Sequence, residues 1–172
     1  MRRPSTLVSR EQPPNPTDYD STMRSFITTA SLLAYATSAY ATNYIVKDYC
    51  TENVFLFFAN SSLTTEPFEL ASGEAYTHDI TGSGISVGVV KNADDYWSAT
   101  GPKLILGTTA NETEAELYWT VSSVDGDPMK GEGFSVTSDG RVPNVCGNAT
   151  SYDGLVHACA DDGNVTLSLN LC

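Results

Sequence analysis

The chain has 172 residues, of which 41% are hydrophobic and 17% are charged, a composition typical of one globular domain with a real core. Its 21 acidic side chains outnumber its 9 basic ones and give a formal net charge of −12. A surface of this sign repels nucleic acid and anionic lipid, so we expect neither a nucleic-acid nor a membrane partner.

The first 41 residues form two segments that we predict to lie outside the folded domain. Residues 1–22 carry three arginines and four prolines without apolar periodicity, so they are either a disordered extension or a mis-assigned start. Residues 23–41 begin with Met23 and Arg24, continue with an apolar run, and end in Ala39-Tyr40-Ala41. This order predicts a signal peptide cleaved after Ala41, and the run is too short to span a membrane. A buried helix is the alternative for this run.

Residues 42–172 are predicted to form a single domain made almost entirely of strands. This part keeps 5 of the 9 basic and 18 of the 21 acidic residues, a formal charge near −13. Runs with period-2 alternation are separated by turns rich in glycine and aspartate, a pattern that predicts a β-sandwich or barrel. The predicted strands are 43–47, 54–59, 67–70, 75–80, 85–90, 103–106, 116–121, 133–137 and 164–171. No segment shows a helical period over three turns.

The loop Asp94-Asp95-Tyr96-Trp97 is the best candidate for ligand binding. Aromatic faces pack against sugar rings and carboxylates accept hydroxyl hydrogens, so this mixture suits a carbohydrate. The alternative is that Trp97 fills the core and the two aspartates are merely solvated.

A second acidic stretch follows the strand predicted at 116–121. Glu116, Asp125 and Asp127 are weak candidates for the two carboxylates that glycoside hydrolysis requires. The alternative for Asp125 is a turn residue that caps backbone amides. Neither Asp125-Gly126-Asp127 nor Asp161-Asp162-Gly163-Asn164 has the spacing of a calcium loop, so we predict no metal site. We predict no cofactor, and no Gly-x-Ser-x-Gly elbow supports a serine nucleophile.

Sequons and cysteines support export from the cell. The four sequons begin at Asn60, Asn111, Asn148 and Asn164, and none has proline in its middle position. Asn164 is expected to face water from the strand predicted at 164–171. The four cysteines, Cys50, Cys146, Cys159 and Cys172, all follow the predicted cleavage site. An even count in a secreted chain predicts two disulfides, with three possible connectivities.

Several motifs, taken in order, resemble those of thaumatin-like proteins. They are Asn43-Tyr44-Ile45-Val46-Lys47-Asp48-Tyr49-Cys50, Phe68-Glu69-Leu70-Ala71-Ser72-Gly73-Glu74 and Val121-Ser122-Ser123-Val124-Asp125-Gly126 followed by Pro128-Met129. With few cysteines, and with Asp95-Tyr96-Trp97, Gly101-Pro102 and Tyr118-Trp119, the chain is similar to the small yeast-phase-specific (BYS-type) fungal group of that family.

The resemblance implies a thaumatin-like antiparallel β-sandwich over residues 42–172, stapled by two disulfides. It also implies the pair Cys50–Cys172, because that family joins its first cysteine to one near the carboxyl end. Cys146–Cys159 would then close a short loop, worth about 3 kcal/mol in the chain-entropy model.

One family feature is not fully matched. Many plant relatives have an acidic cleft built from an arginine and four carboxylates. Asp125 occupies one matching position, but Thr120 stands where another carboxylate is expected, and Arg141 lies beyond the signature.

Three functions are therefore considered for a secreted protein that is extracellular or held in the cell wall and monomeric by default. The preferred hypothesis is a non-catalytic wall-associated or host-interface protein that binds β-glucan or another glycan. The alternatives are a weak endo-β-glucanase with an acidic cleft and an antigen or effector that acts on a host protein.

Overall fold

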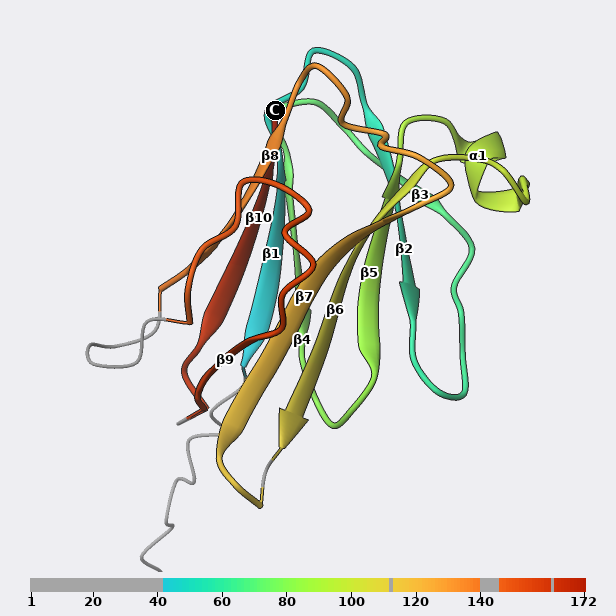
Figure 1. Cartoon of the computed structure of the whole chain (residues 1–172). Coiled ribbons are helices and arrows are strands. Elements are labelled where there is room, and N and C mark those ends of the chain that lie inside the picture. Colours follow the sequence, from blue (N-terminus) through green and yellow to red (C-terminus); the bar gives the residue numbers. More distant parts are fainter. Residues whose placement is uncertain (1–41, 112, 140–145, 162) are drawn as a thin grey trace, which may run out of the picture. The chain divides into compact units, whose positions relative to one another are not determined.

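The computed structural model describes residues 42–111, 113–139, 146–161 and 163–172. The predicted extension, the predicted signal peptide, Arg141 and Asp162 lie outside these ranges. The described residues form the strands β1 (Asn43–Asp48), β2 (Val54–Ala59), β3 (Phe68–Leu70), β4 (Ala75–Asp79), β5 (Ile85–Val90), β6 (Lys103–Asn111), β7 (Glu116–Val124), β8 (Phe134–Ser138), β9 (His157–Ala160) and β10 (Thr166–Leu171), and one helix, α1 (Ala93–Trp97) (Figure 1).

The strands make two sheets, which confirms the predicted all-β sandwich. The first sheet has the order β4-β1-β10-β8, and the second has the order β3-β2-β5-β6-β7-β9. All pairs are antiparallel except β1 and β10, which run parallel from Asn43 opposite Thr166 to Asp48 opposite Leu171. At this one parallel pair the first and last strands of the domain lie side by side in the same direction within an otherwise antiparallel sandwich. No described helix is long and apolar enough to cross a membrane.

The core lies between the two sheets and follows the period-2 alternation of the strands. Tyr44 and Val46 on β1 are fully buried, as are Leu167, Leu169 and Leu171 on β10. The same hydrophobic cluster includes alternating residues of β5, β6 and β7, namely Ile85, Val87, Val89, Leu104, Leu106, Leu117, Trp119 and Val121. Strands β1 and β10 therefore bury one face and leave the other face less buried.

The structure differs from the sequence prediction in the lengths and number of its elements. Strands β6 and β7 continue to Asn111 and Val124 because they pair along nine residues each, and pairing of this length outweighs the weak β-propensity of Gly107 and Ala110. Strand β9 was not predicted, since four residues carry little pattern; it pairs with β7 next to the disulfide at Cys159. Helix α1 is five residues long, too short to show a helical period.

The two disulfides join Cys50 to Cys172 and Cys146 to Cys159, the pairing that the family resemblance implies. The first links the residue two positions after β1 to the last residue of the chain, beside the parallel pair of β1 and β10. The second links β9 to the segment that opens at Cys146. The first bridge thus reinforces the four-stranded sheet, and the second attaches the edge of the six-stranded sheet.

Candidate functional site

Helix α1 presents an exposed tryptophan on an anchored support. Trp97 is 66% exposed, so the alternative in which it fills the core is wrong. Its neighbour Tyr96 donates a hydrogen bond of 3.0 Å from its hydroxyl to the carbonyl of Thr65 and packs edge-on against Phe57, with ring centroids 4.9 Å apart. The Trp97 ring meets the Tyr96 ring edge-on at 4.6 Å. Trp97 is therefore held in place by a residue fixed to β2 and its following loop.

The carboxylates of α1 lie next to this tryptophan. Asp94 is exposed and Asp95 is half-buried, with Asn92 Nδ2 donating to Asp95 Oδ2 at 3.3 Å. The chain that follows folds back on the helix, since a Cβ at Gly101 would lie only 2.3 Å from the Asp95 carbonyl oxygen. Only glycine allows the chain to come this close to Asp95. The close approach places Pro102, the next residue, beside the turn that follows β7.

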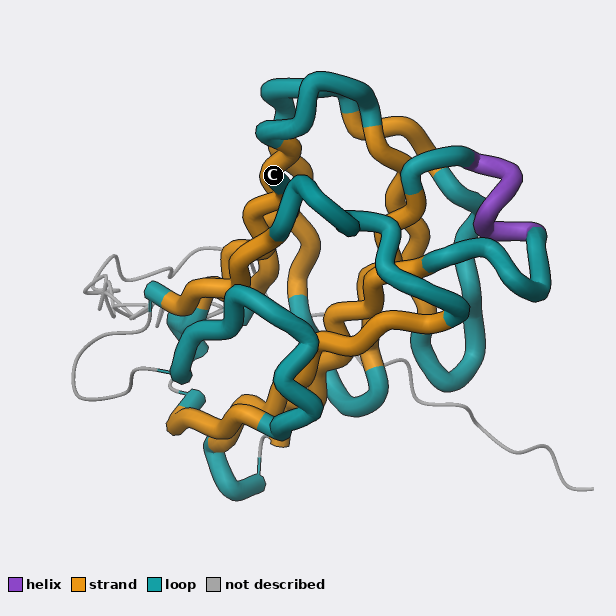
Figure 2. Tube along the Cα trace, turned by 45° about the horizontal axis from the view of Figure 1, so that its top comes forward, coloured by secondary structure: helices purple, strands orange, loops and turns teal. Residues whose placement is uncertain are grey.

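The acidic turn after β7 is the next element of the site. A Cβ at Gly126 would lie 3.4 Å from Pro102 Cβ, and Figures 1 and 2 both show this turn beside α1. Asp125 is exposed and has a left-handed backbone, with φ of 57°. The fold thus brings the two predicted acidic motifs together. We name this group the acidic–aromatic rim: Asp94, Asp95, Trp97 and Asp125.

The lysine that follows α1 forms no ion pair with a rim carboxylate. Lys103 Nζ donates to the carbonyls of Ser98 and Gly101 at 2.9 and 2.8 Å, which closes the loop after α1. Neither of the two ion pairs among the described residues includes a rim carboxylate. The rim therefore combines an aromatic face with carboxylate acceptors and carries net negative charge.

Asp127 is directed to a different place. Its Oδ1 accepts hydrogen bonds from the Met129 amide at 2.8 Å and from the Tyr152 hydroxyl at 2.6 Å. Burial, followed by the hydrogen bond to this carboxylate, raises the pKa of Tyr152 above its ordinary value. Asp127 lines a separate hollow of about 420 Å³ together with Glu132 and Phe134. Its visible role is to cap the turn and to hold Tyr152.

Glu116 lies too far from the turn to act with it. It accepts a hydrogen bond from the hydroxyl of Tyr118 at the start of β7, whereas Asp125 follows the last residue of this nine-residue strand. A strand of this length spans about 30 Å, and the two carboxylates of a glycosidase lie about 5–10 Å apart. A catalytic pair that combines Glu116 with Asp125 or Asp127 is therefore wrong.

The four sequon asparagines lie at the surface of the described domain. Asn60, Asn148 and Asn164 are exposed, and Asn111, the last residue of β6, is half-buried. The placement of Asn164 on a strand is wrong, because pairing in β10 begins at Thr166. Glycan occupancy remains a prediction at all four positions.

The other residues considered for an acidic cleft do not complete one at Asp125 among the described residues. Thr120 lies on β7 and lines a hollow on the outer face of the six-stranded sheet, and Arg141 is outside the described residues. Asp161 Oδ1 accepts hydrogen bonds from the Thr42 hydroxyl and from the Gly163 amide, the latter at 2.9 Å. This carboxylate is therefore engaged in local structure at its own turn.

The structure also contains a charged cluster that the sequence interpretation missed. Asp48, at the end of β1, is fully buried, and its Oδ1 accepts the Cys50 amide at 2.8 Å. Lys91 forms an ion pair with Glu132 nearby. Burial raises the pKa of Asp48 above its usual 3.8; the Cys50 amide and the Lys91 charge lower it, and Glu132 raises it. Asp48 continues the buried alternation of Tyr44 and Val46, and that signal could have identified it.

We expect the stability of the protein to decrease as Asp48 ionises. Because the pKa of Asp48 is raised in the folded protein, the folded state binds this proton more tightly than the unfolded state does. The protonated carboxyl therefore contributes fully to the free energy of unfolding below about pH 4, and this contribution is lost as pH rises through the folded pKa. Asp48→Asn, which keeps an oxygen for the Cys50 amide, should therefore gain stability relative to wild type as pH increases. Urea unfolding of both proteins between about pH 3 and pH 7 measures this difference.

Asp94→Asn is the matched control, because this carboxylate is exposed. If the stability of Asp48→Asn relative to wild type instead falls with rising pH, the attraction of Lys91 outweighs the burial of Asp48.

The comparisons with known proteins agree with this architecture. The family model described as Blastomyces yeast-phase-specific protein matches residues 31–172. The crystal structure of the protein elicitor MoHrip2 from Magnaporthe oryzae is similar with a TM-score of 0.61 and 20% identity, covering 77% of this chain and 99% of that one. The thaumatin-like xylanase inhibitor TLXI is similar with a TM-score of 0.50 and 11% identity, covering 75% of this chain and 98% of that one. A search of curated proteins found no match.

The two structural neighbours share the fold of this chain at low identity, and the family model covers all of the described residues. The chain belongs to the Blastomyces yeast-phase-specific protein family and has a thaumatin-like fold.

Proposed function

We propose that this is a secreted fungal protein that binds a neutral polysaccharide at the acidic–aromatic rim without hydrolysing it. The observation that carries the proposal is Trp97, which is 66% exposed and anchored through Tyr96. A rigid, exposed aromatic ring offers a face for sugar stacking at small entropic cost, and the neighbouring carboxylates accept hydrogen bonds from sugar hydroxyls.

Two disulfides and membership of this family support an extracellular location. The signal peptide, glycan attachment and association with the cell wall belong to the same proposal. A net charge of −12 favours an uncharged polymer such as β-glucan, chitin or mannan over an anionic one.

The absence of hydrolysis is proposed from the geometry of the acidic residues. Glu116 is at the opposite end of β7 from Asp125, and Asp127 is engaged with Met129 and Tyr152. The endo-β-glucanase alternative would therefore have to use carboxylates of the rim itself, which makes Asp125 the residue that tests it.

Trp97→Ala is expected to weaken binding to an insoluble polysaccharide by about tenfold or more, because loss of an aromatic anchor costs more than about 1.4 kcal/mol. Its free energy of unfolding should stay within about 0.5 kcal/mol of wild type, since the side chain is exposed. The measurement is a pull-down on β-glucan, chitin and mannan, with released reducing sugar assayed in the same tubes. Tyr49→Ala is the control, because Tyr49 is 61% exposed on the loop after β1.

Binding that Trp97→Ala reduces and Tyr49→Ala does not, without sugar release, supports the proposal. Sugar release that Asp125→Asn abolishes would instead establish the glucanase. Failure to bind any of the three polymers would overturn the proposal and leave the host-protein alternative, in which the rim contacts a protein.

A further inference from the structure

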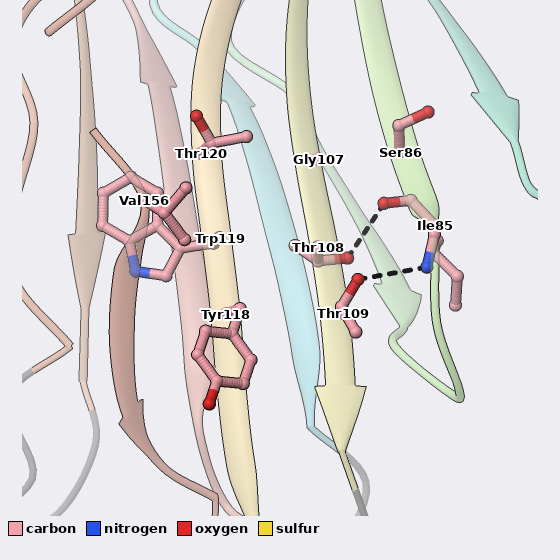
Figure 3. Close-up of a pocket in the computed structure, with 10 residues that line it drawn as sticks. Ile85, Ser86, Gly107, Thr108, Thr109, Tyr118, Trp119, Thr120 and Val156 are labelled. Atoms are coloured by element: carbon pink, nitrogen blue, oxygen red, sulfur yellow. Dashed lines mark hydrogen bonds between the residues drawn. The ribbon is translucent and has the colours of Figure 1, made fainter. Parts of the chain in front are cut away.

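The outer face of the six-stranded sheet carries a trough away from the rim. The register places Ser86 opposite Gly107 and Gly107 opposite Thr120, so three small residues form one row across β5, β6 and β7. The next row contains Thr109 and Tyr118, which are also opposite each other. These residues line a hollow of about 350 Å³, whose lining also includes Val156. Figure 3 shows their side chains on β5, β6 and β7.

The trough continues toward a sequon. A second hollow, of about 460 Å³, shares Thr109 and Tyr118 with the first and reaches Asn111. Asn111 is four residues from Gly107 along β6, about 13 Å. Because residues two apart on a strand face the same side, Asn111 is on the same face as Thr109 and Gly107.

The two halves of this face are covered differently. Near α1, the Phe57 ring lies where a Cβ of Gly88 would be, 2.0 Å from that position, and Tyr96 packs on Phe57. A Cβ at Gly107 would meet only Thr120 Cγ2, at 3.6 Å. Val156, beside the trough, is 71% exposed. The protein thus covers one half of the face with its own side chains and leaves the other half open.

We propose that an N-linked glycan on Asn111 occupies this trough. The transfer forms a bond between Asn111 Nδ2 and the anomeric carbon of an oligosaccharide. The bond from that carbon to a lipid pyrophosphate breaks, the pyrophosphate leaves with the electron pair, and one amide proton is released. A glycan attached here is covalently held at one end of a trough that is long enough to receive its first sugars.

The chemistry of the trough suits sugar rings. The hydroxyl of Tyr118 is tied to Glu116, so the position of its ring is fixed at the edge of both hollows. Ser86, Thr109 and Thr120 supply hydroxyl groups. The glycine floor admits a flat ring close to the backbone, and this uncharged lining offers no partner for a charged peptide.

Attachment at Asn111 is compatible with the local hydrogen bonds. Its Oδ1 accepts the amides of Thr113 and Glu114 at 3.2 and 3.3 Å, which orients the side chain. Its Nδ2 donates to Glu114 Oε2 at 2.7 Å. After glycosylation the nitrogen keeps one hydrogen, so it can retain this bond while it carries the sugar.

The test uses the full chain secreted from a eukaryotic host. Mass spectrometry should find a glycan at Asn111, and Asn111→Gln and Thr113→Val should each remove it. A glycan-releasing amidase should act on the native protein about tenfold more slowly at Asn111 than it does on Gly107→Leu, whose side chain fills the trough. Such a rate ratio corresponds to an equilibrium that favours the docked glycan about tenfold.

Ser122→Leu is the matched control, since Ser122 is on the outer face of β7 but does not line the trough; its native release rate should equal that of wild type. Tyr118→Ala is a second variant if Gly107→Leu does not fold, and it should also speed release. An unmodified Asn111, or equal native release in wild type and in the folded trough variants, would overturn the proposal.

Discussion

Replacing Cys50 and Cys172 together with serine is expected to lower the free energy of unfolding by about 5 kcal/mol. The two residues are separated by 122 positions, and in the chain-entropy model a disulfide stabilises more when it closes a longer loop of the unfolded chain. Cys146 and Cys159 are separated by 13 positions, so the same model predicts about 3 kcal/mol for that pair.

Guanidinium unfolding of the two double variants and wild type under non-reducing conditions measures both effects. The midpoint should fall further for the first variant than for the second. An equal or larger loss from the short loop would contradict the entropic explanation. It would indicate that the Cys146–Cys159 bridge stabilises mainly through native contacts at β9.

The second large effect is expected at Trp119. Its side chain is 1% exposed, its Nε1 donates to the Cys146 carbonyl at 2.9 Å, and its ring stacks on His157 with centroids 4.0 Å apart. Trp119→Ala removes the largest fully buried side chain and should cost about 3–5 kcal/mol. Trp119→Phe keeps an aromatic ring but leaves the carbonyl without this donor, and should cost about 1–3 kcal/mol.

Urea unfolding followed by circular dichroism is the appropriate measurement, because these variants change tryptophan fluorescence itself. Trp97→Ala, which removes an exposed tryptophan, is the control and should leave stability almost unchanged. If Trp119→Phe lowers the free energy of unfolding as much as Trp119→Ala does, the hydrogen bond from the indole N–H to the Cys146 carbonyl contributes more to stability than the buried area of the ring.

The candidate site shows how this fold assembles function from distant segments. Trp97 is on a five-residue helix, whereas Asp125 follows a strand that ends 27 residues later at Val124. The link between them is a glycine that allows the chain to pass close to Asp95, followed by Pro102 against the turn at Gly126. Variants at Gly101 would therefore disturb both halves of the rim together.

The sequence alone determined the class of structure and most of its strands. Alternation of apolar and polar residues indicates which face of a strand is buried, and residues 54–59 and 85–90 were predicted with their observed bounds. The Asp94–Trp97 and Asp125–Asp127 motifs were also recognised as separate candidates. These patterns depend only on neighbouring residues, so they can be recognised without knowledge of the fold.

Only the tertiary structure decided which of these elements meet. The alternation in β1 and β10 does not reveal that they pair in parallel, and neither motif reveals that α1 lies beside the turn after β7. The sequence likewise does not reveal that Glu116 and Asp125, which are close in sequence, lie at opposite ends of β7. The physical reason is that side-chain period encodes the buried face, whereas strand partners and register depend on contacts between residues far apart in the chain.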